Sequence, residues 1–155
     1  MSVIFPIFNN ADYLERCVES VINQTLQDIE LILINDGSTD KRTPAICDKF
    51  ARMDSRVRVI HKENVGSAAG RNQGIELANG KYVAFVESDD YVVPTMYAQL
   101  YHLAAWTDAD IVKCNFFQCF GEITRETNYF SQLGKTGVEF TATERPRIFG
   151  YHASI

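Results

Sequence analysis

Three carboxylates, Glu87, Asp89 and Asp90, follow directly after the apolar run of residues 82–86. Like charges this close together repel each other and raise one another's pKa, a cost that a divalent cation removes. Carboxylate oxygens are hard ligands of the kind that Mg²⁺ and Mn²⁺ prefer, with a substrate phosphate completing the coordination shell. Spacing alone leaves a second interpretation open, a solvated acidic turn that caps the next helix.

A strand is predicted to carry this acidic segment, because residues 82–86 are all apolar or aromatic, as in a strand buried on both faces. Carboxylates at the C-terminal end of such a strand lie where open α/β sheets hold their ligands. Three further strands are predicted over residues 2–8, 29–34 and 57–60. We expect the first of them to end or fray at Pro6, since proline cannot donate to a sheet ladder.

Helices are predicted between these strands, over residues 11–24, from Thr43-Pro44 onward, and over residues 68–78. The second helix is expected to bury Met53, and Gly80 is expected to adopt the left-handed conformation after the third. Regular alternation of strand and helix predicts a mostly parallel α/β sheet. Four more elements are expected afterwards: a helix from near Pro94, a strand over 111–120, a returning strand over 122–130 and the start of a helix over 143–148.

Composition narrows the class of protein. The chain has 155 residues, the size of one domain, and its net charge of −5 without any Lys/Arg run argues against nucleic acid as a partner. An anionic nucleotide stays possible, because a metal and backbone N–H groups can meet its phosphates. The four cysteines form no Cys-x-x-Cys pair, so they are interpreted as reduced, with Cys17 and Cys47 in the core.

Neither an apolar run of membrane-spanning length nor a signal peptide is found in the sequence. The simplest setting for reduced cysteines is the cytoplasm. Peripheral association with the inner face of a membrane, through segments outside this sequence, is compatible with these observations.

Four segments together carry a resemblance: Pro6-Ile7-Phe8-Asn9, Asn35-Asp36-Gly37-Ser38-Thr39-Asp40, Gly66-Ser67-Ala68-Ala69-Gly70-Arg71-Asn72-Gln73-Gly74 and Glu87-Ser88-Asp89-Asp90. In this order, each at a strand's C-terminal end or a helix start, they resemble the N-terminal, nucleotide-sugar-binding part of family-2 glycosyltransferases with the GT-A fold. The resemblance implies a Rossmann-like, mostly parallel sheet flanked by helices. It also implies a nucleotide-sugar-binding core over residues 1–120 and an incomplete acceptor-side region over residues 121–155.

The resemblance implies a nucleobase site at Pro6, Phe8 and Asn9, where Phe8 stacks on uracil or a similar base in place of the family's usual Tyr. Asp36 matches the carboxylate that accepts the uracil imide N–H, and Asn35 replaces a common acidic neighbour. Two plainer interpretations stay open. Phe8 could simply be a packed core aromatic, and Asp36 could be a turn former.

The segment Glu87-Ser88-Asp89 matches the family's metal-binding Asp-x-Asp motif, with Asp89 as the principal ligand to Mn²⁺ or Mg²⁺. Glu87 stands where an Asp is usual and reaches one methylene further, and Asp90 is the extra acid often seen after the motif. Arg71 resembles a basic residue that faces the diphosphate or braces the acidic cluster. An exposed helix arginine is the alternative for Arg71.

The resemblance implies inverting transfer of a sugar from a nucleotide-diphosphate donor, with a UDP-sugar favoured, to a saccharide or lipid-linked acceptor in cell-surface polysaccharide or glycoconjugate synthesis. In the family a carboxylate in a downstream Glu-Asp type motif acts as the base. The late acids Glu139 and Glu144 do not sit in that pattern, so the base is expected beyond Ile155 and the chain is expected to be cut short on the acceptor side.

Two alternatives compete with an enzyme of this kind. One is a nucleotide-sugar-binding module without turnover. The other is a different α/β nucleotide binder, such as a nucleotidyltransferase, which would want a Gly-rich, basic loop after the first strand. This chain has Phe8-Asn9-Asn10 at that place, which argues against the second alternative.

Overall fold

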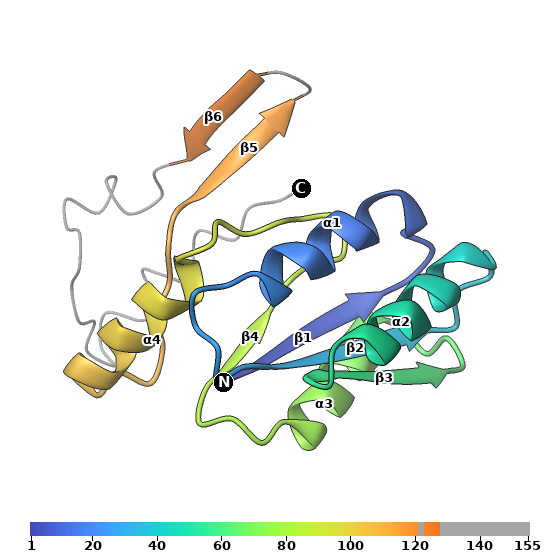
Figure 1. The fold of residues 1–155 in the computed structure, drawn as a ribbon, viewed down its shortest axis with the longest axis horizontal. Helices are drawn as coiled ribbons and strands as arrows, with labels where there is room; N and C mark the ends of the chain where they lie inside the picture. The colour runs from blue at the N-terminus through green and yellow to red at the C-terminus, as the bar shows by residue number, and fades with distance from the viewer. Residues whose placement is uncertain (121–122, 128–155) are drawn as a thin grey trace. The chain divides into compact units, whose positions relative to one another are not determined.

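A computed structural model describes residues 1–120 and 123–127 of the chain. The chain divides into two compact units, residues 1–101 and 102–155. The first unit contains a four-stranded parallel sheet of order β3-β2-β1-β4 (Figure 1). Its elements in chain order are β1 Ser2–Ile7, α1 Ala11–Ile22, β2 Glu30–Asp36, α2 Arg42–Met53, β3 Val57–Lys62, α3 Ser67–Leu77 and β4 Val83–Phe85.

Strands β1 and β2 are buried along nearly their whole length, because helices cover both faces of the sheet (Figure 1). Side chains alternate between the faces. Val3 and Phe5 of β1 join α1 and α2 in the larger cluster of the core, which also holds Cys17 and Cys47, as predicted. Ile4 belongs to the smaller cluster on the α3 side.

Strand β1 continues through Pro6, so the prediction that it ends or frays there is wrong. Ser2 and Ile4 face β4: the Ser2 N–H donates to Tyr82 and the Ile4 carbonyl accepts from Val86 N–H. Pro6, two residues further, faces the same side. Because β4 has already ended at Phe85, no ladder hydrogen bond is required of the missing proline N–H.

The fourth strand is shorter and more exposed than predicted. Its Val83 and Phe85 are 39% and 42% exposed, so the prediction of a strand buried on both faces is wrong. Among the described strands of this sheet, β4 pairs only with β1 and lies at the edge. Met53, expected in the core, is also exposed, since it occupies the last position of α2.

Gly80 does not adopt the predicted left-handed conformation, which the structure records for Gly37 and Gly66 among the described glycines. Glycine at position 80 has a different reason: a Cβ there would lie 2.6 Å from the backbone nitrogen of Ser2. The close approach of two backbone segments therefore requires the missing side chain.

Helix α4, Met96–Thr107, crosses the boundary between the two units. In the second unit, β5 (Phe116–Phe120) pairs antiparallel with β6 (Ile123–Thr127), which confirms the predicted returning strand and starts the fifth strand later than expected. The helix predicted over 143–148 lies outside the described residues. The functional boundary predicted at residue 120 stays a prediction. In the described part of the chain, every helix is too short or too polar to cross a membrane.

Candidate functional site

An open pocket of about 390 Å³ lies where β1, β2 and β4 end, at the C-terminal edge of the sheet. Parallel strands present these ends together, so residues far apart in sequence meet there. Of the predicted site residues, six line the pocket: Pro6, Phe8, Asp36, Glu87, Ser88 and Asp89. The rest of the lining consists of Ile7, Asn10, Asn64, Gly66, Ser67 and Gly70.

Phe8 directly follows the last residue of β1 and is 48% exposed. An aromatic side chain that served only to finish a core strand would be buried, as Phe5 of the same strand is. The exposed ring instead forms part of the pocket wall. Its face can stack on a planar heterocycle, because stacking needs only the ring and no hydroxyl group.

Asp36 is the last residue of β2 and is only 4% exposed. One carboxylate oxygen accepts a hydrogen bond from Gly66 N–H at 2.9 Å, and the other accepts from Val65 N–H at 3.2 Å. The ammonium group of Lys62 lies 3.4 Å away. Asp36 thus holds the loop before α3 in place. Its role is therefore not limited to forming the turn after β2. A carboxylate has about four acceptor sites, so a further donor can still bind.

Asn9 holds the loop that follows β2. Its side-chain oxygen accepts from Thr39 N–H at 2.7 Å and from Asp40 N–H at 3.2 Å, while its own backbone N–H donates to Ser38 Oγ at 3.0 Å. Asn9 adopts a positive φ of 49°, which asparagine tolerates better than most residues. Asn9 does not line the pocket, and its predicted contact with the donor stays a prediction.

Helix α1 positions the acidic segment that follows β4. The side-chain amide of Asn10 donates to Ser88 Oγ at 2.8 Å, and the Cys17 thiol donates to the Glu87 carbonyl at 3.3 Å. Further along, Ser20 Oγ accepts from Val92 N–H at 3.1 Å. The acids at 87, 89 and 90 are therefore placed by contacts along one side of a helix that lies about seventy residues earlier in the chain.

The electrostatics of the segment match the repulsion expected from its sequence. Burial and the neighbouring carboxylates of Asp89 and Glu87 raise the pKa of Asp90. Burial, followed by Asp90 and Asp89, raises the pKa of the Cys17 thiol to about 12, so this thiol stays protonated and acts as a hydrogen-bond donor. Arg71 of α3 forms a salt bridge with Glu87, which shows that it is not a free surface arginine.

Comparison with known proteins identifies the chain. A model of the family described as "Glycosyl transferase family 2" matches residues 2–152. The chain belongs to glycosyl transferase family 2. This membership confirms the resemblance seen in the four sequence segments.

Several relatives of this family are similar over most of the chain. The "Uncharacterized glycosyltransferase YibD" of Escherichia coli K12 is 47% identical over 140 residues, which cover 89% of this chain and 40% of the relative. "Glycosyltransferase GlyG" of Streptococcus pneumoniae serotype 4 is 48% identical over 118 residues, covering 76% and 39%. The chain thus spans about two fifths of the length of these curated relatives.

A solved structure of S. aureus TarS (residues 1–349, in complex with UDP-GlcNAc) superposes with a TM-score of 0.65 at 27% identity. The match covers 70% of this chain and 32% of the TarS chain. Together with the parallel sheet and its flanking helices, it confirms the predicted α/β GT-A fold of this family-2 member.

The family resemblance implied a metal at Asp89, with Glu87 and Asp90 nearby. Among residues 1–120 and 123–127, no three His, Cys, Asp or Glu side chains converge on one point, so the three acids do not form the expected cluster of three ligands. Glu87 is instead turned to Arg71. Mg²⁺ is usually held by one or two carboxylates together with substrate phosphates, and Asp89, exposed in the pocket wall, suits that smaller role.

Three polar residues in or near this family-2 pocket were not among the predicted site residues. Asn10 precedes α1, but its side chain makes no cap hydrogen bond and donates to Ser88 instead. Asn64 lines the pocket from the loop before α3. His61, at the end of β3, contacts both Asn35 and Asp48. Only contacts between distant elements could have revealed these roles.

Proposed function

We propose that this chain is the donor-binding part of a glycosyltransferase that uses a nucleotide-diphosphate sugar, with a UDP-sugar as the preferred donor. The observation that carries the proposal is the pocket, whose wall combines an exposed aromatic ring at Phe8, a buried carboxylate at Asp36 and the acids of the Glu87-Ser88-Asp89 segment. The UDP-GlcNAc bound by TarS, a similar solved structure, supports this choice of donor.

In the proposed complex the base stacks on Phe8, and Asp36 accepts the imide N–H of uracil. Selectivity against adenine follows because Asp36 offers only acceptors, and the ring nitrogen N1 of adenine is itself an acceptor where uracil has its imide N–H. Asp36 is well suited to this task, since Val65, Gly66 and Lys62 already fix its orientation. A carboxylate held in place loses little freedom when it binds a ligand.

The diphosphate would lie towards Asp89, which would hold a divalent cation together with the phosphate oxygens. The ion, Mn²⁺ or Mg²⁺, would neutralise charge on the departing diphosphate. Arg71, anchored on Glu87, would brace the acidic segment against the repulsion among its acids. Ser88, held by Asn10, would keep the segment in register with α1.

For the whole protein we propose inverting transfer to a saccharide or lipid-linked acceptor, in polysaccharide or glycoconjugate synthesis. Such transfer needs a base within hydrogen-bond reach of the acceptor hydroxyl. Asp36, Glu87 and Asp89 all have duties on the donor side in this proposal. A carboxylate bound to a cation is also a poor base, because the ion stabilises its charged form. The base is therefore assigned to none of these three residues.

Competition calorimetry tests the donor assignment. We expect UDP to bind more tightly than ADP or GDP, and to bind more tightly with Mn²⁺ than with a chelator. The variant Asp36→Asn should flatten the preference among bases by about tenfold, because an amide can orient as donor or acceptor and one charge-assisted hydrogen bond is lost. Asp28→Asn changes an exposed aspartate before β2 and serves as the matched control.

Equal affinity for UDP, ADP and GDP in the unmutated chain would contradict the assignment of the base pocket. A preference that survives Asp36→Asn unchanged would locate base reading at another residue of the pocket.

A further inference from the structure

Asn35, directly before Asp36 at the end of β2, is only 4% exposed, and both ends of its side-chain amide have partners. Its oxygen accepts from the backbone N–H of Ser38 at 3.2 Å. Its nitrogen lies 2.8 Å from Nδ1 of His61, on β3. Nε2 of His61 lies 3.0 Å from a carboxylate oxygen of Asp48, on α2. Asn35, His61 and Asp48 thus form a hydrogen-bonded chain across three elements.

The direction of every hydrogen bond in this chain follows from one fixed donor. The backbone N–H of Ser38 can only donate, so the side-chain atom of Asn35 that faces it must be the oxygen. The amide NH₂ then faces His61, whose Nδ1 must accept. The ring proton therefore resides on Nε2 and is donated to Asp48. The His61 ring is held in one neutral tautomer.

This chain of contacts ends at the turn that presents Asp36. Ser38, the residue fixed by Asn35, closes a turn through Gly37, whose φ of +69° strongly favours glycine. A Cβ on Gly37 would also lie 2.6 Å from the backbone nitrogen of Asn64, so this turn and the loop before α3 are close-packed. A shift at Ser38 would therefore move both Asp36 and the backbone donors that orient its carboxylate.

We propose that Asn35 and His61 are positioning residues for base selection: they hold the turn in which Asp36 reads the nucleobase, while Asp48 fixes the tautomer of His61. The inference rests on the proposed function, since it assigns base reading to Asp36. It also gives Asn35 a reason to be an amide. An ionised aspartate at this position has no proton to donate to Nδ1 of His61. A hydrogen bond between them would require a proton on Nδ1.

The experiment compares His61→Leu, which removes the acceptor, with His61→Asn, whose amide oxygen can occupy the place of Nδ1. Affinity is measured for UDP and for inorganic pyrophosphate, both with Mn²⁺. In His61→Leu we expect UDP to bind about tenfold more weakly, as for the loss of one hydrogen bond, with pyrophosphate affinity unchanged. His61→Asn should restore most of the UDP affinity.

A structural role alone would weaken both ligands and would not be rescued by His61→Asn, so that outcome would overturn the proposal. Thermal unfolding of each variant identifies loss of the fold directly. If the unmutated chain binds UDP more tightly than ADP and GDP, and His61→Leu binds UDP as tightly as the unmutated chain does, the inference fails while the proposed function stands. If the unmutated chain shows no preference for UDP over ADP and GDP, both fail.

Nitrogen NMR of the imidazole ring provides a second test that does not depend on any ligand. In the unmutated chain, His61 should show a protonated Nε2 and an unprotonated Nδ1. In Asn35→Asp, Nδ1 should carry a proton, because the carboxylate can only accept. The same Nδ1 signal in both proteins, or a protonated Nδ1 in the unmutated chain, would overturn the proposal.

Discussion

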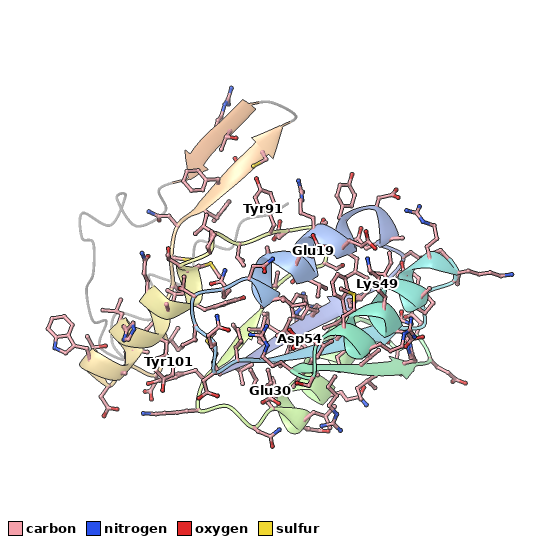
Figure 2. All side chains as sticks on the ribbon, viewed as in Figure 1. Glu19, Glu30, Lys49, Asp54, Tyr91 and Tyr101 are labelled. Carbon is pink, nitrogen blue, oxygen red and sulfur yellow. The ribbon has the colours of Figure 1, made fainter. Side chains whose placement is uncertain are left out.

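The two ends of the parallel sheet use carboxylates in opposite ways. Where the strands begin lies Glu30, which is labelled in Figure 2. It accepts hydrogen bonds from Ser2 Oγ at 2.6 Å, Asn79 N–H at 2.6 Å and Gly80 N–H at 3.2 Å. Where the strands end, Glu87, Asp89 and Asp90 lie within four consecutive positions of the sequence. Within the described residues, no salt bridge reaches Asp89 or Asp90.

The pKa shifts of the two regions have opposite signs. At Glu30 burial raises the pKa, but the hydrogen bonds from Ser2, Asn79 and Gly80 outweigh it, so the net pKa lies below its usual value. At Asp90 burial acts in the same direction as the charges of Asp89 and Glu87, and the pKa is raised. Preformed donors therefore stabilise the charged form of Glu30, whereas burial and neighbouring charges destabilise the charged form of Asp90.

The largest effect is expected at the C-terminal end of the sheet. Asp89→Ala should abolish the gain in UDP affinity that Mn²⁺ provides, a loss of about a hundredfold or more, since mutating a residue that only hydrogen-bonds to a metal ligand already costs about ten- to hundredfold in metal affinity. The unfolding temperature should stay the same or rise, because one member of a repelling group is removed. Calorimetry with Mn²⁺ and with a chelator, together with thermal unfolding, measures both. A variant that unfolds more easily would break the contrast between the two ends.

A smaller effect is expected where the strands begin, and it should fall on stability and not on UDP affinity. Glu30→Ala should lower the free energy of unfolding by about 1–2 kcal/mol, because the N–H groups of Asn79 and Gly80 and the hydroxyl of Ser2 lose their acceptor. UDP affinity should not change. Urea unfolding followed by circular dichroism measures the loss. Glu19→Ala, an exposed position on α1, is the matched control and should stay within about 0.5 kcal/mol.

The smallest effect is expected in how the contribution of Glu30 to stability depends on pH. Because the folded pKa of Glu30 lies below its usual value, its charged form stabilises the fold. This contribution is present above the unfolded pKa and is lost as the pH falls through the folded pKa. The stability difference between the unmutated chain and Glu30→Gln should therefore shrink between about pH 7 and about pH 3, on either side of the ordinary glutamate pKa. A difference that grows on acidification would reverse the assigned sign.

The sequence by itself determined the fold class and the place of the pocket. Alternating apolar strands and amphipathic helices predicted a parallel α/β sheet, because burial of a sheet on both faces leaves that pattern. The order of turn and acidic segments placed Phe8, Asp36 and Asp89 at strand ends, and such ends necessarily meet at one edge of a parallel sheet. Helical periodicity likewise identified Cys17 and Cys47 as core residues.

Only the tertiary structure decided how the polar side chains pair. Asn10 and Ser88 lie 78 positions apart, and Asn35 and His61 lie 26 apart, so no local pattern links them. Glycine at position 80 is required by a neighbouring backbone, because a Cβ there would meet the nitrogen of Ser2. The sequence likewise left open where Glu87 points, and the structure shows it turned to Arg71. Side-chain direction depends on partners from other elements, which periodicity along a single segment does not contain.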